Sequence, residues 1–373
     1  MIAQALFRPF TLGALSLPNR LVMAPMTRYF SPSGVPGLDV ARYYARRAQA
    51  GVGLIMTEGT FIPHPSAHGF SNVPCFYGER ALAGWREVLT QVHDAGGRIF
   101  PQLWHAGIAR QKGMEPDPSI PGFAPSATPD GHKSMSDSEI ADVIAAYAQA
   151  AGTAQAMGFD GVEIHGAHGY LIDAFLWAGT NGRTDRWGGD PLARTRFAVE
   201  VVRAVRSRVG PDFPISFRWS QFKQQDYLAR IADTPQELER VLTAIADAGV
   251  TLFHASARRF WTPAFDGSDL SLAGWTRRLT GLPTIAVGSV GLAGISRIDG
   301  ASDLPGGGYS FTGSAAGEIS QLADLAERLL HGEFDLVAVG RSLLSDPEWA
   351  AKIREGRFAD RIGFDKAHLA QLL

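Results

Sequence analysis

Cysteine is almost absent from this chain, in which Cys75 is the single one among 373 residues. A disulfide needs two cysteines, and a zinc site built on cysteines needs at least as many. The chain alone therefore holds neither a disulfide framework nor a cysteine zinc site. Such sparse use of cysteine agrees with the reducing cytoplasm, which is the location that we expect.

Long apolar runs and an excess of one charge are also lacking. No stretch approaches the ~20 apolar residues that a membrane-spanning helix needs. The 35 Lys and Arg nearly balance the 37 Asp and Glu, so the basic excess typical of nucleic-acid-binding proteins is missing. We expect a small-molecule substrate, no nucleic-acid or membrane partner, and either a monomer or a homodimer.

The Gly-x-Gly-x-x-Gly pattern of dinucleotide-binding sheets follows none of the apolar runs, which disfavours an open doubly wound sheet. Instead, short β-branched runs alternate with segments of helical periodicity. Eight such runs predict an α/β fold, a single (β/α)8 TIM barrel over residues 1–373 with an N-terminal hairpin and extended βα loops. The predicted strands are Leu21–Ala24, Gly53–Thr57, Arg98–Leu103, Gly161–His165, Pro214–Trp219, Thr251–Ala255, Thr284–Gly288 and Leu336–Gly340.

The segments between these strands are expected to be helices, and two of them carry clear start signals. Ser136 with Glu139 predicts a capping box, and Thr234 before Pro235 predicts an N-cap. The predicted helices are Leu38–Ala50, Glu79–Ala95, Ser136–Met157, Pro191–Val209, Pro235–Ala248 and Glu318–Leu330.

The remaining length falls into four long loops, 108–133, 177–190, 258–275 and 300–317. The last contains Gly308 and Gly313 at the spacing of a phosphate-binding P-loop, but Ser314 stands where that motif requires lysine. This favours a plain flexible insertion.

Polar residues stand at the ends of the predicted strands, and barrel enzymes carry their sites at these carboxyl ends. Thr27 follows the first strand, Gln102 lies in the third, and Arg218 lies in the fifth. Hydroxyl, amide, imidazole and guanidinium groups on one rim suit a planar polar heterocycle with a phosphate tail.

Glycines at the ends of the seventh and eighth strands predict a phosphate site. Gly288, Ser289 and Gly340 allow backbone N–H groups to approach an anion, and Arg341 can add a charged hydrogen bond. The alternative is a pair of tight turns with Arg341 in a surface ion pair.

The sharpest local motif is His165-x-x-His168-x-Tyr170. Two imidazoles can donate hydrogen bonds to one substrate oxygen, and a phenol nearby can supply a proton. A zinc site needs a further ligand, and we expect Glu163 to point to the other face of its strand. Histidines that are simply satisfied in the core are the remaining alternative.

Six segments together resemble the Old Yellow Enzyme family, in the order and spacing of that family and over nearly the whole chain. They are Asn19–Arg28, Gln102–His105, Gly158–His165, His168–Leu171, Asn181–Asp185 with Gly188 and Gly189, and Val339–Arg341 with Asp346 and Pro347.

This resemblance implies FMN as the cofactor, NADPH or NADH as the reductant, and ene-reductase activity. It implies that Gly288, Ser289, Gly340 and Arg341 hold the phosphate, and that Pro25, Met26, Thr27, Gln102 and Arg218 contact the isoalloxazine, with His165 within reach. Glu58 is a further candidate for binding the cofactor and could equally be a structural partner for an arginine. It implies that His165 and His168 bind the activating oxygen, that Tyr170 donates the proton, and that Trp104 and Tyr29 form walls of the substrate site.

Several positions depart from the family pattern. Thr27 stands where one branch has cysteine, His168 where asparagine is frequent, and Trp187 where tyrosine is common. Segments 221–228 and 258–275 are atypical, which bears on substrate shape. Arg258, Arg259, Arg277 and Arg278 are the candidates for binding a coenzyme 2′-phosphate.

Three hypotheses follow for the function. The first is NAD(P)H-dependent reduction of an activated C=C bond, and the second is flavin-dependent reduction of nitro compounds or nitrate esters. The third is a non-redox, phosphate-binding barrel. Demethylase relatives that carry an iron–sulfur domain are excluded, because one cysteine cannot hold such a cluster.

Overall fold

The computed structural model describes residues 1–292, 295–297, 309–311 and 315–373. The predicted loop 300–317, including the Gly308–Gly313 spacing, lies for the most part outside the described residues.

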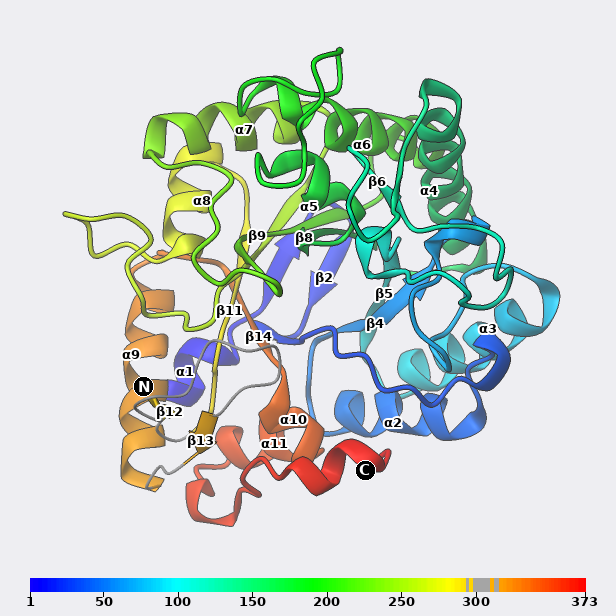
Figure 1. The fold of residues 1–373 in the computed structure, drawn as a ribbon. Helices are drawn as coiled ribbons and strands as arrows, with labels where there is room; N and C mark the ends of the chain where they lie inside the picture. The colour runs from blue at the N-terminus through cyan, green and yellow to red at the C-terminus, as the bar shows by residue number, and fades with distance from the viewer. Residues whose placement is uncertain (293–294, 298–308, 312–314) are drawn as a thin grey trace.

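The centre of the molecule is a closed barrel of eight parallel strands, as the sequence predicts (Figure 1). Around the barrel the order is β10, β11, β14, β3, β4, β5, β8, β9, so each strand pairs with its neighbour along the chain once the short outer strands are set aside. The barrel strands are β3 (Leu21–Met23), β4 (Leu54–Phe61), β5 (Arg98–Trp104), β8 (Val162–His168), β9 (Ile215–Lys223), β10 (Leu252–Ser256), β11 (Thr284–Val287) and β14 (Leu336–Val339).

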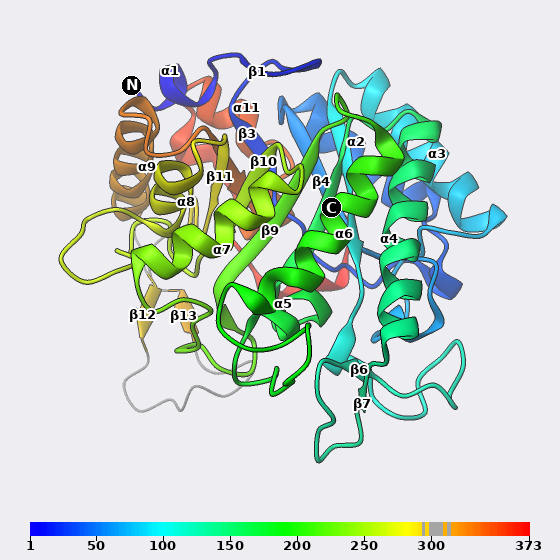
Figure 2. The same cartoon turned by 90° about the horizontal axis from the view of Figure 1, so that it is seen from above.

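Amphipathic helices cover the outside of the barrel (Figures 1 and 2). Ser136 begins α4 with the predicted capping box, and the hydroxyl of Thr234 caps α7 by accepting from the backbone N–H of Glu237. The helices are α1 (Ile2–Leu6), α2 (Leu38–Gln49), α3 (Glu79–Asp94), α4 (Asp137–Met157), α5 (Leu171–Leu176), α6 (Arg196–Val209), α7 (Pro235–Asp247), α8 (Leu272–Thr280), α9 (Ala315–Leu330), α10 (Arg341–Ser345) and α11 (Trp349–Arg354).

An antiparallel hairpin of β1 (Phe10–Leu12) and β2 (Leu15–Leu17) closes one end of the barrel. Phe10, Leu15 and Leu17 pack with side chains of the barrel strands in one buried cluster. In Figure 2 this hairpin lies at the opposite end from the short pairs β6 (Phe123–Ala124) with β7 (Lys133–Ser134) and β12 (Ile295–Arg297) with β13 (Tyr309–Phe311). The hairpin thus covers the amino ends of the barrel strands, opposite the carboxyl ends at which barrel enzymes carry their sites.

The structure corrects several predicted boundaries. Strand β8 continues to His168, and β9 continues to Lys223, because His168 pairs with Lys223 after an irregularity at Gly166. The expected loop 258–275 ends early, since α8 begins at Leu272, and the predicted helix over 191–209 begins only at Arg196 after a 3-10 turn. The short helices α1, α5, α10 and α11 were missed, because five or six residues carry too little periodicity to be recognised.

Candidate active site

The carboxyl ends of the strands surround two adjacent cavities. The large cavity has a volume of about 570 Å³, and the small cavity has a volume of about 230 Å³. Pro25, Thr27 and Arg218 line both, so the two spaces meet along these side chains. Together they have the size of an ordinary cofactor and substrate site.

The small cavity collects the predicted catalytic residues. Gln102, Trp104, His165, His168 and Tyr170 all line it. The ring centroid of His165 lies 5.2 Å from that of His168 and 5.0 Å from that of Tyr170. The ring centroids of Trp104 and Tyr170 lie 4.7 Å apart. Strands β5 and β8 therefore bring these four rings to the same end of the barrel, as the sequence predicts.

Both imidazoles are neutral at ordinary pH. Burial, followed by the nearby Arg218 guanidinium, lowers the pKa of His165 to about 3. The same two causes hold the pKa of His168 well below its usual value. A neutral imidazole has one N–H, so each ring can still donate one hydrogen bond to an oxygen in the cavity.

The hydroxyl of Ser256 can donate to a ring nitrogen of His168. Its Nε2 lies 2.8 Å from Oγ of Ser256, which also accepts from Nη2 of Arg218 at 3.3 Å. Arginine can only donate, so the serine proton is available for Nε2 of His168. With Nε2 accepting, the neutral ring carries its proton on Nδ1, which is the donor left for a ligand.

Tyr170 is an almost fully buried phenol at the edge of the small cavity. Its oxygen accepts a hydrogen bond from Nε2 of Gln224 at 3.1 Å. Burial raises the pKa of Tyr170 to about 12. The phenol therefore keeps its proton at neutral pH and can give it to a bound molecule.

Below the small cavity lies a buried polar network that the sequence analysis missed. Glu163 accepts from Nε2 of Gln102 at 2.8 Å, from Oγ of Ser216 at 2.9 Å, and from Nδ1 of His254 at 2.7 Å. The expectation that Glu163 points to the other face of its strand was wrong: it stands two residues from His165, and alternate residues share a face. That spacing was the signal that could have found it.

The charge of Glu163 is kept by its partners. Burial alone raises its pKa, but His254, Arg218 and Ser216 together lower the pKa to about 2. The carboxylate of Glu163 thus fixes the side chain of Gln102 by accepting its hydrogen bond, while Gln102 lines the small cavity.

The large cavity contains the predicted phosphate residues. Gly288, Ser289, Gly340 and Arg341 line it, together with Met26. Gly288 has φ of +149°, and a Cβ atom there would lie 2.6 Å from the carbonyl oxygen of Ala257. Only glycine allows the turns after β10 and β11 to approach this closely.

This close approach brings in cations from the atypical segment 258–275. Oγ of Ser289 donates to the carbonyl oxygen of Arg258 at 2.8 Å, which fastens the two turns together. Burial, followed by repulsion from Arg258, lowers the pKa of Arg341, so the two guanidinium groups lie near each other. Arg258, Arg259 and Lys366 also line the large cavity, and none of its described lining residues is acidic.

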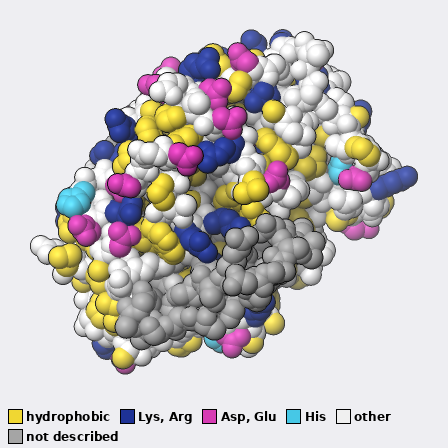
Figure 3. All heavy atoms as spheres, turned by 60° about the vertical axis from the view of Figure 1, so that its left-hand side comes forward, with side chains coloured by type: hydrophobic (Ala, Val, Ile, Leu, Met, Phe, Trp, Pro, Cys, Tyr) yellow, Lys and Arg dark blue, Asp and Glu magenta, His cyan; other side chains and the backbone are white. Residues whose placement is uncertain are grey.

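The candidates for 2′-phosphate binding separate into two groups. Arg258 and Arg259 line the large cavity. Arg277 instead forms an ion pair with Asp335 at 2.8 Å, and Arg278 lies over the ring of Trp275; neither lines the large or the small cavity. Figure 3 shows Lys and Arg side chains beside the undescribed residues, which follow β11 in the chain.

Two predicted site residues lie behind or outside the cavities. Glu58 lines neither cavity; its Oε2 accepts from the backbone N–H of Arg28 at 2.9 Å and so supports the segment that carries Thr27. Tyr29 is 51% exposed and packs its ring edge-on against Phe70 at 6.3 Å, outside the residues that line either cavity.

The residues present fit FMN. Nδ1 of His165 and Nε of Arg218 are buried without a hydrogen-bond partner, which indicates that polar atoms of a ligand belong beside them. The large cavity joins apolar walls, such as Met26 and Val287, to a cationic end with Arg341. Such a site matches a flat ring system attached to a phosphate.

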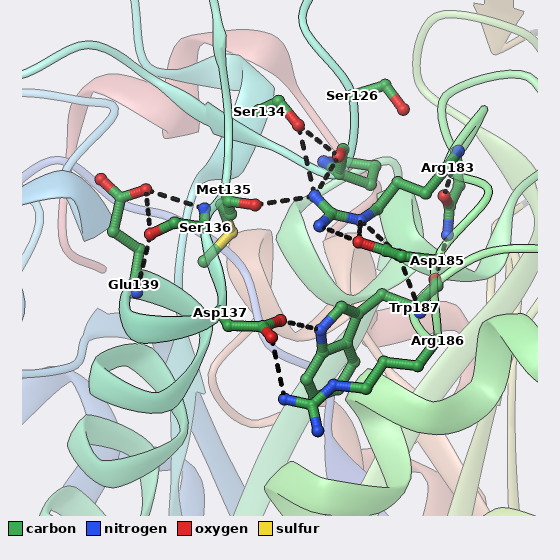
Figure 4. A network of polar contacts seen from close by, with 12 residues as sticks. Ser126, Ser134, Met135, Ser136, Asp137, Glu139, Arg183, Asp185, Arg186 and Trp187 are labelled. Carbon is green, nitrogen blue, oxygen red and sulfur yellow. Dashed lines mark hydrogen bonds and ion pairs between the residues drawn. The ribbon is translucent and has the colours of Figure 1, made fainter.

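The signature Asn181–Asp185 serves the scaffold of the site. Arg183 donates to the carbonyl oxygens of Pro125 at 2.8 Å and Met135 at 2.7 Å, and it pairs with Asp185 (Figure 4). These bonds fasten the loop after α5 to the β6–β7 excursion and to the start of α4. The loop thereby supports α5, which directly follows Tyr170.

The described part of the chain lacks two further features. No helix there is long and apolar enough to cross a membrane. No group of three or more His, Cys, Asp or Glu side chains in those ranges could hold a metal ion.

Comparison with known proteins identifies relatives in one family. The family described as NADH:flavin oxidoreductase / NADH oxidase matches residues 5–296. The chain is 32% identical to an NADH oxidase of Thermoanaerobacter brockii over 370 residues, 94% of this chain and 51% of that protein. It is 41% identical to 12-oxophytodienoate reductase 7 of Oryza sativa subsp. japonica over 223 residues, 56% of each protein. The chain thus spans about half the length of these two relatives.

Other relatives match over nearly their whole length. The flavin oxidoreductase hxnT of Emericella nidulans is 33% identical, over 95% of this chain and 91% of that protein. Among solved structures, morphinone reductase in complex with tetrahydroNAD has a TM-score of 0.78 and 29% identity, over 98% of this chain and 93% of that one. The Old Yellow Enzyme homologue from Zymomonas mobilis has a TM-score of 0.77 and 26% identity, over 98% and 96%. This chain belongs to the NADH:flavin oxidoreductase / NADH oxidase family, the Old Yellow Enzyme family.

Proposed function

We propose that this protein is an FMN-dependent NAD(P)H oxidoreductase that reduces the C=C bond of α,β-unsaturated carbonyl or nitro compounds. The observation that carries the proposal is the small cavity, in which two neutral imidazoles and a protonated phenol surround one space. This space joins the large cavity at Pro25, Thr27 and Arg218.

The two histidines bind and activate the substrate. His165 and His168 donate hydrogen bonds to its carbonyl or nitro oxygen, and these bonds strengthen as negative charge develops on that oxygen. Because both rings are neutral, they polarise the substrate without giving up a proton. Trp104 packs edge-on against Tyr170 at one wall of the cavity and limits the space that the alkene can occupy.

Tyr170 completes the reaction by protonating the α-carbon of the substrate. The family cofactor, when bound, supplies the hydride for the β-carbon, which it obtains from NADPH or NADH. Gln102 and Arg218 are the residues that contact the ring system, and Arg218 offers positive charge where reduction leaves negative charge. Gly288, Ser289, Gly340 and Arg341 hold the phosphate, and Arg258 adds a second cation there.

To test this function, the two half-reactions are measured separately in the variant Tyr170→Phe. Flavin reduction by NADPH, followed by stopped-flow absorbance, should keep its rate, because no proton from Tyr170 is needed. Reoxidation of the reduced protein by 2-cyclohexenone should slow roughly 10²-fold or more, the scale of a lost general acid. Equal losses in both halves would contradict the proton-donor role.

A nitro group presents the same kind of oxygen to His165 and His168, so nitroalkenes belong to the proposed substrate class. Arg259 is the candidate for the choice between NADPH and NADH, because Arg258 is assigned to the FMN phosphate, and both coenzymes should be compared. Location in the cytoplasm and a monomeric or homodimeric state stay predictions.

A further inference from the structure

The atypical segment 221–228 places the side-chain amide of Gln224 beside the phenol oxygen of Tyr170. Gln224 lines the small cavity beside Tyr170, and its Nε2 donates to the phenol oxygen at 3.1 Å. Its backbone N–H donates to the carbonyl oxygen of His168 at 3.3 Å. One residue of this segment therefore contacts two members of the His165–Tyr170 motif.

The direction of the side-chain bond decides where the proton of the phenol can point. A phenol has one proton, and its oxygen can accept from another donor while it donates its own. With Gln224 donating, the O–H bond of Tyr170 has to turn away from the amide. The rings of Trp104 and His165 pack edge-on against the ring of Tyr170, which lines the small cavity, so we expect the O–H bond to point into this cavity.

Gln224 is held in place by a buried ion pair on the preceding residue. Nζ of Lys223 lies 2.7 Å from Oδ1 of Asp173, and both side chains are 0% exposed. The other oxygen of Asp173 accepts from the backbone N–H of Gly169 at 2.7 Å. One carboxylate thus connects the turn that precedes Tyr170 with the segment that carries Gln224.

That turn needs such support. His168 and Gly169 both have positive φ, +68° and +85°, and positive φ is uncommon for a residue other than glycine. Oγ of Ser220 accepts from the backbone N–H of His168 at 3.0 Å, which adds a second attachment from β9. The segment beyond the predicted end of β9 is therefore built onto the catalytic turn.

We propose that Gln224 is a positioning residue for Tyr170, whose amide turns the phenolic O–H toward the α-carbon of the substrate. The inference rests on the proposed reduction of activated alkenes and names a residue that controls its protonation step. Gln224 is itself exposed at the cavity edge, so replacing it leaves the barrel core intact.

The experiment uses the FMN-loaded protein and stopped-flow absorbance with the two half-reactions measured separately. In Gln224→Leu, reoxidation by 2-cyclohexenone should slow about tenfold, a part of what a general acid contributes, while reduction by NADPH keeps its rate. Gln224→Glu should be slower still, because a carboxylate accepts the phenol proton and directs it away from the substrate. Leu228→Ala is the control, since the side chain of Leu228 lies in the same segment, is 87% exposed and lines neither cavity.

A double-mutant cycle distinguishes positioning of Tyr170 from a general structural effect. In the Tyr170→Phe background there is no phenol to orient, so adding Gln224→Leu should leave the reoxidation rate unchanged. FMN affinity and the melting temperature of Gln224→Leu should equal those of the unaltered protein.

The outcomes separate this inference from the proposed function. If the unaltered protein reacts with the enone and Gln224→Leu reacts equally fast, the role of Gln224 is refuted and the function stands. A tenfold effect that persists without the phenol, or wild-type rates in Gln224→Glu, also refutes it. If the unaltered protein is not reoxidised by the enone, the function fails and the inference fails with it.

Discussion

Glu58 shows at the scale of one residue how the site depends on groups that do not touch a ligand. Its side chain is buried, Oε2 accepts from the backbone N–H of Arg28, and Oε1 has no hydrogen-bond partner. Burial raises its pKa from 4.5 to about 7, although its hydrogen bonds and the charge of Arg28 oppose this shift. The carboxyl group therefore titrates near neutral pH while it supports the segment that carries Thr27.

This titration predicts how stability depends on pH. Between pH 4.5 and about 7 the folded protein keeps a proton on Glu58 that the unfolded chain has released. The free energy of unfolding should therefore fall as pH rises through this window, by up to about 3 kcal/mol. Glu58→Gln removes the titration and keeps an oxygen that accepts from Arg28.

Thermal unfolding followed by circular dichroism, between about pH 5 and about pH 8, measures the difference. The melting temperature of the unaltered protein should drop over this range by more than that of Glu58→Gln. Parallel pH profiles for the two proteins would show that Glu58 does not titrate there.

At the scale of elements, the starts of the barrel strands could be predicted from the sequence, whereas the end of β9 and the short outer helices could not. Each of the eight barrel strands begins within one residue of its predicted start, because β-branched runs carry a local signal. The end of β9 was missed because Gln221 and Lys223 are polar and carry no strand signal; this part of the strand forms where Lys223 pairs with His168 of β8.

The same limit explains why most site residues could be predicted, while Gln224 and Lys366 were missed. Gln102, His165, His168 and Tyr170 stand at strand ends, where the fold itself predicts a site. Gln224 reaches the small cavity from a loop and Lys366 reaches the large cavity from a 3-10 turn, and the course of both segments is set by tertiary packing rather than by periodicity.

Gly288 lies where the loops after β10 and β11 approach each other, so a side chain there should weaken FMN binding. In Gly288→Ala the new Cβ would meet Ala257 O at 2.6 Å and backbone nitrogens of Arg259 and Phe260 at 2.9 Å, so the turns have to separate. We expect the dissociation constant of FMN to rise at least about tenfold, or ~1.4 kcal/mol, in a fluorescence titration.

Gly281→Ala is the control for this change. Gly281 also has positive φ, +68°, but a Cβ there meets nothing within 4 Å, and it ends α8 away from both cavities. It should lower stability by roughly 1 kcal/mol and leave FMN affinity unchanged. Equal FMN affinities for the two variants would argue against Gly288 as part of the phosphate site.

At the scale of the whole molecule, we propose that residues 1–373 form one domain. The hairpin β1–β2 fills one end of the barrel, and the last residues reach back to the other end, where Lys366 and Leu369 line the large cavity. Nη2 of Arg28 fastens this last segment by donating to the carbonyl oxygens of three of its residues, His368, Leu369 and Gln371. The cofactor site therefore draws on residues from both ends of the chain.

We propose that FMN lies across the open end of the barrel with its phosphate at Arg341. Titration of the flavin-free protein with FMN, followed by quenching of flavin fluorescence, tests this most directly. We predict that one FMN binds per chain. The affinity for FMN should fall about 10- to 100-fold in Arg341→Met, because a charged hydrogen bond is lost. It should not change in Arg277→Met, which removes an arginine that pairs with Asp335 outside both cavities. No binding of FMN, or equal affinities in all three proteins, would contradict the account.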